Sequence, residues 1–191
     1  MRADHFHELA ISGEKADVVM FGDSVTEFAN WSELLGRPIA NRGIAGETVE
    51  DLRARAEDVV ALRPKVLFIL AGMNDLQRGV SPKDVLARYS ALLTELRSAL
   101  PETRIVVQAV LPVRDRWAQF ADEIAELNEL LARYSKNMGA TWLDVGPRLA
   151  DGSGFLAAQN TRDGGHLTGA AYRIWANAVR PLLPPNSPGD R

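Results

Sequence analysis

The sequence predicts an α/β sandwich built on a mainly parallel sheet of about five strands. Short apolar runs of strand length alternate along the chain with longer segments of helical periodicity. The apolar runs are continuous, which is typical of strands buried on both faces of a parallel sheet. No repeat, linker or shift of composition divides the 191 residues. We therefore expect one domain over residues 1–191, with a core at about 17–180 and a frayed, proline-rich tail at 185–191.

Five segments are expected to form the strands of this sheet. The clearest is VLFILA at residues 66–71, and VVMF at 18–21 and IVVQAVL at 105–111 have the same continuous apolar character. TWLDV at 141–145 is shorter, and PIAN at 38–41 is weaker. These segments fix the places where a site can form, because ligands of open parallel sheets bind beyond the carboxyl ends of the strands.

Four longer helices are expected around the sheet. Thr48 can cap a helix over residues 49–62, and Ser81, followed by a proline, can cap another that continues to about residue 100. The other two span about residues 119–137 and 169–180. No element is assigned to the polar stretch that precedes the first strand.

The composition excludes several classes of function. A net charge of −3 provides neither a basic surface for nucleic acid nor a cationic face for membranes. The absence of cysteine excludes disulfide scaffolds and thiolate zinc sites. The N-terminal residues lack the apolar core of a signal peptide, and no apolar run approaches membrane-spanning length. We expect a cytoplasmic protein with no membrane span and no nucleic-acid partner.

Residues that follow the strands predict the chemistry of acyl transfer from an ester. Ser24 comes directly after the first strand, and its hydroxyl needs a base to become a nucleophile. His166 stands among glycines ahead of the last helix and can supply that base. Asp163, three residues earlier, can bring its carboxylate to the imidazole Nδ1 and stabilise the imidazolium that forms.

Ester hydrolysis also requires hydrogen-bond donors for the oxyanion that develops on the attacked carbonyl. The backbone N–H groups of Ser24 and Gly46 and the side-chain amide of Asn74 follow three different strands and could converge there. Each feature alone is weak evidence, because serine, asparagine and aspartate are ordinary cap and turn residues. Their conjunction at one edge of the sheet favours a serine esterase.

These sequence blocks, in this order, resemble those of the GDSL esterase/lipase family, also called SGNH hydrolases. Gly22-Asp23-Ser24 resembles the nucleophile block, and NRGIAGET resembles the second block, whose oxyanion glycine falls on Gly46. GMND matches the third block, whose asparagine falls on Asn74, and Asp163-x-x-His166 matches the last. The likeness covers residues 17 to about 180, and Val25 stands where the family motif has leucine.

The resemblance implies a three-layer, flavodoxin-like α/β/α fold with a five-stranded parallel sheet. It also implies hydrolysis without a metal or other cofactor, through an acyl-enzyme on Ser24. The phrases NRGIAGET, LAGMNDL, VLPVRD and DGGHLT look most like those of compact bacterial acyl or acetyl esterases and of platelet-activating-factor acetylhydrolase catalytic subunits. The expected substrate is therefore a small-molecule ester with a short acyl group, acetyl above all.

Further residues near the strand ends are candidates for substrate lining or for supporting the site. Asp23 is expected to bond nearby backbone donors and stiffen the nucleophile turn. Asp75 can orient the oxyanion donors or serve as a turn residue. The arginines can hold a polar substrate group or be solvated, and the tryptophans can line the pocket or pack in the core. These candidates are Arg42, Arg114, Trp31 and Trp117.

The same site residues would also serve an acyltransferase, a thioesterase or a lysophospholipase. A non-catalytic carbohydrate- or lipid-binding module on a hydrolase-like fold is a further alternative. A binding module, however, has no physical need of a complete nucleophile, base, acid and oxyanion set. The sequence gives no prediction of the alcohol part of the substrate or of the oligomeric state.

Overall fold

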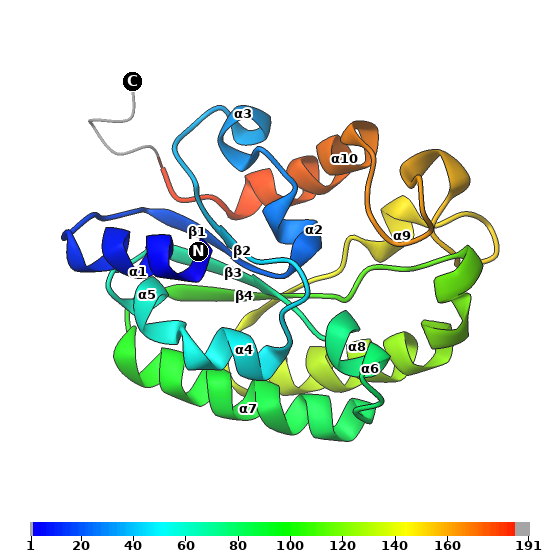
Figure 1. Cartoon of the computed structure of the whole chain (residues 1–191), viewed down its shortest axis with the longest axis horizontal. Coiled ribbons are helices and arrows are strands. Elements are labelled where there is room, and N and C mark those ends of the chain that lie inside the picture. Colours follow the sequence, from blue (N-terminus) through cyan, green and yellow to red (C-terminus); the bar gives the residue numbers. More distant parts are fainter. Residues whose placement is uncertain (1, 186–191) are drawn as a thin grey trace.

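A computed structural model describes residues 2–185 and contains one parallel sheet of five strands (Figure 1). The strands run in the order β2-β1-β3-β4-β5, which is the flavodoxin-like order and confirms the predicted fold class. In the central register, Met20 pairs with Asn41 on one side and Phe68 on the other. The strands are β1 (Val18–Gly22), β2 (Ala40–Gly43), β3 (Val66–Leu70), β4 (Arg104–Gln108) and β5 (Thr141–Leu143).

Strand β4 is shorter than the predicted segment at residues 105–111. Beyond Gln108 the Ala109 N–H still donates to the Leu143 carbonyl of β5, but both backbone polar groups of Val110 bond to one side chain. The Val110 N–H donates to Asn128 Oδ1 at 2.8 Å, and Asn128 Nδ2 donates to the Val110 carbonyl at 2.9 Å. The apolar run therefore continues past the strand and reaches the carboxyl edge of the sheet.

Helices cover both faces of the sheet, as Figure 1 shows. Because successive side chains of a strand point to opposite faces, the strands divide their apolar residues between two cores. Val19, Phe21 and Ile69 pack with α4, α5, α7 and α8, whereas Met20 and Phe68 pack with α3, α9 and α10. The helices are α1 (Arg2–Ile11), α2 (Ser24–Glu27), α3 (Trp31–Leu35), α4 (Val49–Ala54), α5 (Ala56–Val60), α6 (Met73–Gln77), α7 (Pro82–Ala99), α8 (Ala121–Asn137), α9 (Gly146–Leu149) and α10 (Gly169–Val179).

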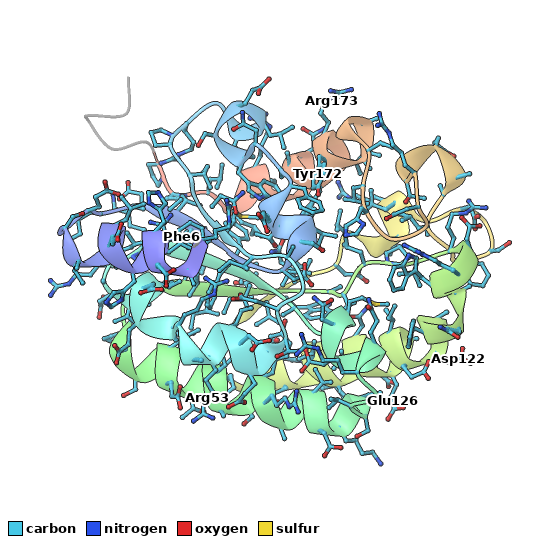
Figure 2. All side chains as sticks on the ribbon, in the orientation of Figure 1. Phe6, Arg53, Asp122, Glu126, Tyr172 and Arg173 are labelled. Atoms are coloured by element: carbon cyan, nitrogen blue, oxygen red, sulfur yellow. The ribbon has the colours of Figure 1, made fainter. Side chains whose placement is uncertain are left out.

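The helices α4 and α7 begin at the predicted caps, because the Thr48 and Ser81 side chains accept from backbone N–H groups in the first turn. The last helix, α10, begins at Gly169 as expected, and the Thr168 side chain caps it in the same way. The outer faces of the helices carry charged side chains, such as Arg53 and Glu126 in Figure 2. No helix within residues 2–185 is long and apolar enough to cross a membrane. Apart from Pro185, the predicted frayed tail lies outside the described residues.

Three helical predictions need correction. The single helix expected at residues 49–62 is two helices, α4 and α5, because the chain turns at Arg55, whose φ is −118°. The helix expected from about residue 119 begins at Ala121, after a 3₁₀ segment at Asp115–Phe120. The N-terminal stretch, to which no element was assigned, forms α1.

Candidate active site

The turn after β1 places Ser24 at the carboxyl edge of the sheet. Asp23 is the N-cap of α2, and its Oδ1 accepts a hydrogen bond from the Val25 N–H at 3.1 Å. Gly22 is required because a Cβ at this position would lie 2.3 Å from the Leu70 carbonyl oxygen and 2.4 Å from Thr26 Oγ1. Glycine at this position therefore allows β1, β3 and α2 to approach closely. Helix α2 begins two residues later, at Ser24.

The segment before α10 brings an acid and a base to this serine. His166 Nε2 lies 3.0 Å from Ser24 Oγ, and His166 Nδ1 lies 2.7 Å from Asp163 Oδ2. An ionised carboxylate only accepts hydrogen bonds, so Asp163 favours the tautomer with its proton on Nδ1. Nε2 then carries a lone pair directed at the serine hydroxyl, which is the arrangement that a general base requires.

Hydrogen bonds hold the Asp163 carboxylate in its charged form. Burial by itself would raise its pKa, but the side-chain bond from His166 and the backbone N–H groups of His166 and Gly165 outweigh burial and lower the pKa below its ordinary value. The carboxylate can therefore stabilise an imidazolium on His166 throughout the neutral range.

The expected oxyanion donors surround the same cavity as Ser24 and His166. This cavity has a volume of about 390 Å³, and Gly46 and Asn74 line it. Gly46 has φ +82°, a left-handed conformation that suits glycine in the loop between β2 and α4. Asn74 Nδ2 donates to the Glu47 carbonyl at 2.9 Å, and an amide nitrogen has a second hydrogen for a substrate oxygen.

The walls of the cavity are mainly apolar. Val110, Leu111 and Val113 line it because the chain after β4 continues to its edge, and Met73 lies beside Asn74 at the start of α6. Phe28 is 56% exposed, and its ring centroid lies 5.3 Å from that of His166. An apolar hollow with a few convergent polar groups is typical of a small-molecule site.

Asp23 and Asp75 are buried carboxylates, and each is next in sequence to a candidate site residue, Ser24 or Asn74. Burial raises the pKa of Asp23 to about 7, although the Val25 N–H and the charge of His166 partly oppose the effect. Burial also raises the pKa of Asp75, against the Val49 N–H at 3.0 Å and Arg88 Nη1 at 2.8 Å. Asp75 thereby ties α6, which carries Asn74, to the first turn of α4.

Two of the secondary candidates support the segment that carries Asp163 and His166. Trp117 lines the cavity, and its Nε1 donates to the Asp163 carbonyl at 3.1 Å. The Arg114 N–H donates to the Gly164 carbonyl at 2.9 Å. A Cβ on Gly164 would lie 2.6 Å from the Arg114 carbonyl oxygen, so the two segments are in close backbone contact.

The other two candidates, Trp31 and Arg42, do not line the cavity, so for Trp31 the structure favours the packing alternative over pocket lining. The Trp31 indole packs edge-on against Trp175 and donates to the Thr26 carbonyl at 2.9 Å. The Arg42 guanidinium lies 4.6 Å from the ring centroid of Phe6. Both side chains point into packed layers rather than toward the strand ends.

Sequence reasoning did not select several of the cavity residues, among them Phe28, Met73, Gln77 and Arg116. Phe28 follows Ser24 by one helical turn, and Gln77 follows Met73 by the same spacing, so helical periodicity could have indicated that each pair shares a side. Within residues 2–185 no group of three His, Cys, Asp or Glu side chains is placed to hold a metal ion.

Comparison with known proteins adds a family and a set of relatives. The sequence model of the family described as GDSL-like Lipase/Acylhydrolase matches residues 20–174 of this chain. Platelet-activating factor acetylhydrolase IB subunit alpha2 of Rattus norvegicus is 25% identical over 177 residues, which cover 88% of this chain and 75% of that protein. Acetylxylan esterase of Geobacillus stearothermophilus is 39% identical over 84 residues, which cover 40% of this chain and 37% of that protein.

A solved structure is also similar over nearly the whole chain. This protein from Streptococcus pneumonia, provisionally described as a platelet activating factor, superposes with a TM-score of 0.87 at 25% identity. The superposition covers 96% of this chain and 91% of the other.

Proposed function

Because this chain belongs to the GDSL-like lipase/acylhydrolase family and is a carboxylic ester hydrolase, we propose that it cleaves short-chain acyl esters by a serine mechanism. Ser24 is the nucleophile, His166 the general base and Asp163 the group that orients it. The observation that carries the proposal is the continuous chain of hydrogen-bond contacts from Asp163 Oδ2 through His166 to Ser24 Oγ, at 2.7 and 3.0 Å.

In the first half of the reaction, Ser24 Oγ attacks the ester carbonyl carbon while His166 Nε2 takes its proton. The carbonyl oxygen becomes an anion that accepts from the Ser24 and Gly46 N–H groups and from the Asn74 amide. When the intermediate collapses, the bond to the alcohol oxygen breaks and His166 returns the proton to that oxygen. The alcohol leaves, and the acyl group remains on Ser24.

In the second half, water replaces the alcohol. His166 Nε2 takes a proton from the water as its oxygen attacks the acyl carbon, and the same three donors hold the new oxyanion. Collapse breaks the bond to Ser24 Oγ, which regains the proton from His166. The products are one carboxylic acid and one alcohol for each ester and water consumed.

The preference for a short acyl group is supported by the cavity and by the relatives. A volume of about 390 Å³ lies near the lower end of the range of about 300–1,000 Å³ for small-molecule pockets. The apolar walls formed by Met73, Val110 and Val113 suit an acyl chain rather than a polar group. Two relatives are named for acetyl esters, a platelet-activating factor acetylhydrolase and an acetylxylan esterase.

The proposal predicts that hydrolysis of p-nitrophenyl esters is fastest from acetyl to butyryl and is lost in Ser24→Ala. The loss should be at least about 1,000-fold in kcat, since the hydroxyl itself forms the covalent intermediate. Initial rates over a series from acetyl to dodecanoyl measure this. Ser98→Ala, on the exposed face of α7, is the matched control and should keep the wild-type rate.

Two results would contradict the proposal in different ways. Activity of Ser24→Ala within a few-fold of wild type would remove Ser24 from the mechanism. Highest activity on decanoyl and dodecanoyl esters, with Ser24→Ala inactive, would keep the mechanism and replace the short-chain preference by that of a lipase or lysophospholipase.

A further inference from the structure

The N-terminal helix α1 lies before the residues that match the family, and it docks beside the loop that carries Gly46. Only Phe6 and Ala10 of this helix are buried, so little apolar surface holds it in place. One of its polar contacts joins it to α5, where His7 Nδ1 lies 3.1 Å from Asp58 Oδ1. The contacts of Arg2 and Phe6 lead instead, directly or through Arg55, to residues 43–47, which we call the oxyanion loop because Gly46 is a proposed oxyanion donor.

The first set of contacts runs from Phe6 through Arg55 to Glu47. The Phe6 ring, at the position labelled in Figure 2, lies 4.6 Å from the Arg42 guanidinium and 5.9 Å from that of Arg55. Arg55 also lies 4.6 Å from the ring of Phe21, so its guanidinium is held between two aromatic faces. From there Arg55 Nη2 and Nε donate to Glu47 Oε2 at 2.5 and 2.8 Å.

This contact reaches an oxyanion donor through the Glu47 backbone. The Glu47 carbonyl accepts from Asn74 Nδ2 at 2.9 Å, so the position of Glu47 determines where the second Asn74 hydrogen points. Burial raises the pKa of the Glu47 carboxyl, and the hydrogen bonds and charge of Arg55 oppose this effect. Because Arg55 and Glu47 are both largely buried, their pairing is sensitive to how well α1 covers them.

The second set of contacts runs from Arg2 to the start of the oxyanion loop. Arg2 Nε donates to the Gly43 carbonyl at 2.7 Å and lies 3.4 Å from Glu27 Oε1. The other oxygen of Glu27 accepts from the Ala45 N–H at 2.6 Å. Arg2 thus fixes the loop directly at Gly43 and indirectly at Ala45, the residue before Gly46.

We infer that α1 is a brace for the oxyanion loop, with Arg2 and Phe6 as positioning residues that keep the Gly46 N–H and the Asn74 amide aimed at the reacting carbonyl. The inference rests on the proposed function, because it assigns α1 a role in the same reaction. Neither residue touches the cavity. Their effect is expected on the transition state, where the oxyanion has formed, rather than on binding of the neutral ester.

The brace is tested by steady-state kinetics of Arg2→Ala and Phe6→Leu on p-nitrophenyl acetate. Phe6→Leu keeps an apolar contact but removes the aromatic face, and Arg2→Ala removes a partly exposed side chain. Because a misplacement of about 1 Å can lower a rate about 100-fold, we expect kcat to fall about 10-fold with KM within about 2-fold. Ile11→Ala, on the same helix and 72% exposed, is the control that should not change kcat.

A double-mutant cycle separates positioning from general destabilisation. Asn74→Ala should lower kcat about 100-fold or more by removing a donor. If Arg2 acts through the oxyanion loop, the 10-fold effect of Arg2→Ala should shrink to about 3-fold or less when Asn74 is already alanine. The inference is wrong if the Arg2→Ala and Asn74→Ala substitutions together lower kcat by the product of their separate factors. It is also wrong if Ile11→Ala lowers kcat as much as Arg2→Ala does.

The same assay distinguishes failure of the brace from failure of the proposed function. If Ser24→Ala is inactive while Arg2→Ala and Phe6→Leu match the wild-type kcat, only the brace is wrong. If Ser24→Ala remains active, the proposed mechanism is wrong before the brace is considered. Thermal unfolding of each variant identifies any that is not folded at the assay temperature, and Arg2→Ala then provides the decisive comparison because its side chain is 39% exposed.

Discussion

At the scale of single residues, the buried carboxyl of Asp23, in the turn before Ser24, should make the stability of the folded protein depend on pH. Its pKa of about 7 lies above the ordinary value of 3.8, so between these pH values the folded protein holds a proton that the unfolded chain has released. Stability contributed by this group is present at low pH and is lost as pH rises from about 4 to about 7. The slope is at most about 1.4 kcal/mol per pH unit.

Asp23→Asn should therefore flatten the decline in stability over this range. Asparagine keeps the oxygen that accepts from the Val25 N–H, but it has no proton to lose. Urea unfolding of both proteins at pH 5, 6 and 7 measures the difference, and groups other than Asp23 contribute equally to both. Parallel declines in the two proteins would show that Asp23 titrates near its ordinary value.

The proposed site residues could be selected from the sequence because several of them follow strands closely. Ser24 and Asn74 each stand three residues past an apolar run, and the order of the blocks resembles a known family. Arg2 and Phe6 could not be found this way. Their contacts join segments distant in the chain, such as Arg2 with Gly43, and no periodicity in a polar stretch records such a pairing.

At the scale of elements, the contact between β2 and α2 depends on the absence of a side chain at Gly43. A Cβ there would lie 2.3 Å from the Glu27 backbone nitrogen and 2.7 Å from its Cα, and backbone cannot give way as a side chain can. Since α2 begins with Ser24, this packing also sets the distance between the nucleophile and the oxyanion loop.

Gly43→Ala should destabilise the protein by about 3 kcal/mol or more, because overpacking against backbone forces two elements apart. It should also lower kcat on p-nitrophenyl acetate. Gly152→Ala is the matched control, since a Cβ there has no neighbour within 4 Å and its φ is not positive. Equal midpoints of thermal unfolding in the two variants would contradict the prediction.

Element boundaries were predicted well where caps mark them and poorly where tertiary contacts decide. Ser81 and Thr168 fixed the starts of α7 and α10 from local chemistry. The break at Arg55 could not be predicted from the sequence, because Arg55 leaves the helix to pair with Glu47. Glu47 lies eight residues earlier, before α4 begins. The N-terminal helix was missed because Phe6 and Ala10 alone form its buried side.

At the scale of the whole molecule, the two cores lie on opposite faces of one sheet. Neither helical layer can lose its packing without exposing one face of the sheet. We therefore predict a single cooperative unfolding transition, which is the behaviour expected of one domain.

Coincident urea transitions by far-UV circular dichroism and by tryptophan fluorescence would support this prediction. The dichroism signal reports the helices on both faces. The fluorescence signal reports the packing of both cores, because Trp31 and Trp175 lie in one core and Trp117 and Trp142 pack against the other. A fluorescence transition at a lower urea concentration than the dichroism transition would show that packing is lost before the helices unfold, and the prediction of a single transition would be wrong.

The alternation of strands and helices predicted the sandwich, whereas the strand order β2-β1-β3-β4-β5 came only from the resemblance. Strand order depends on where each crossover returns, and apolar periodicity within a segment contains no record of its neighbours. The same limit applies to the cavity, whose walls come from α6, the segment after β4 and the segment before α10.

Ser24 and His166, the proposed nucleophile and base, are 142 residues apart in the chain. A ribosome synthesises Ser24, Gly46 and Asn74 well before it reaches Asp163 and His166. The growing chain therefore contains a serine without a base for most of its synthesis, and on the proposed mechanism it cannot attack cellular esters while it is still incomplete. Hydrolysis would begin only when the last helix closes over the sheet, so the onset of activity would itself mark the completion of folding.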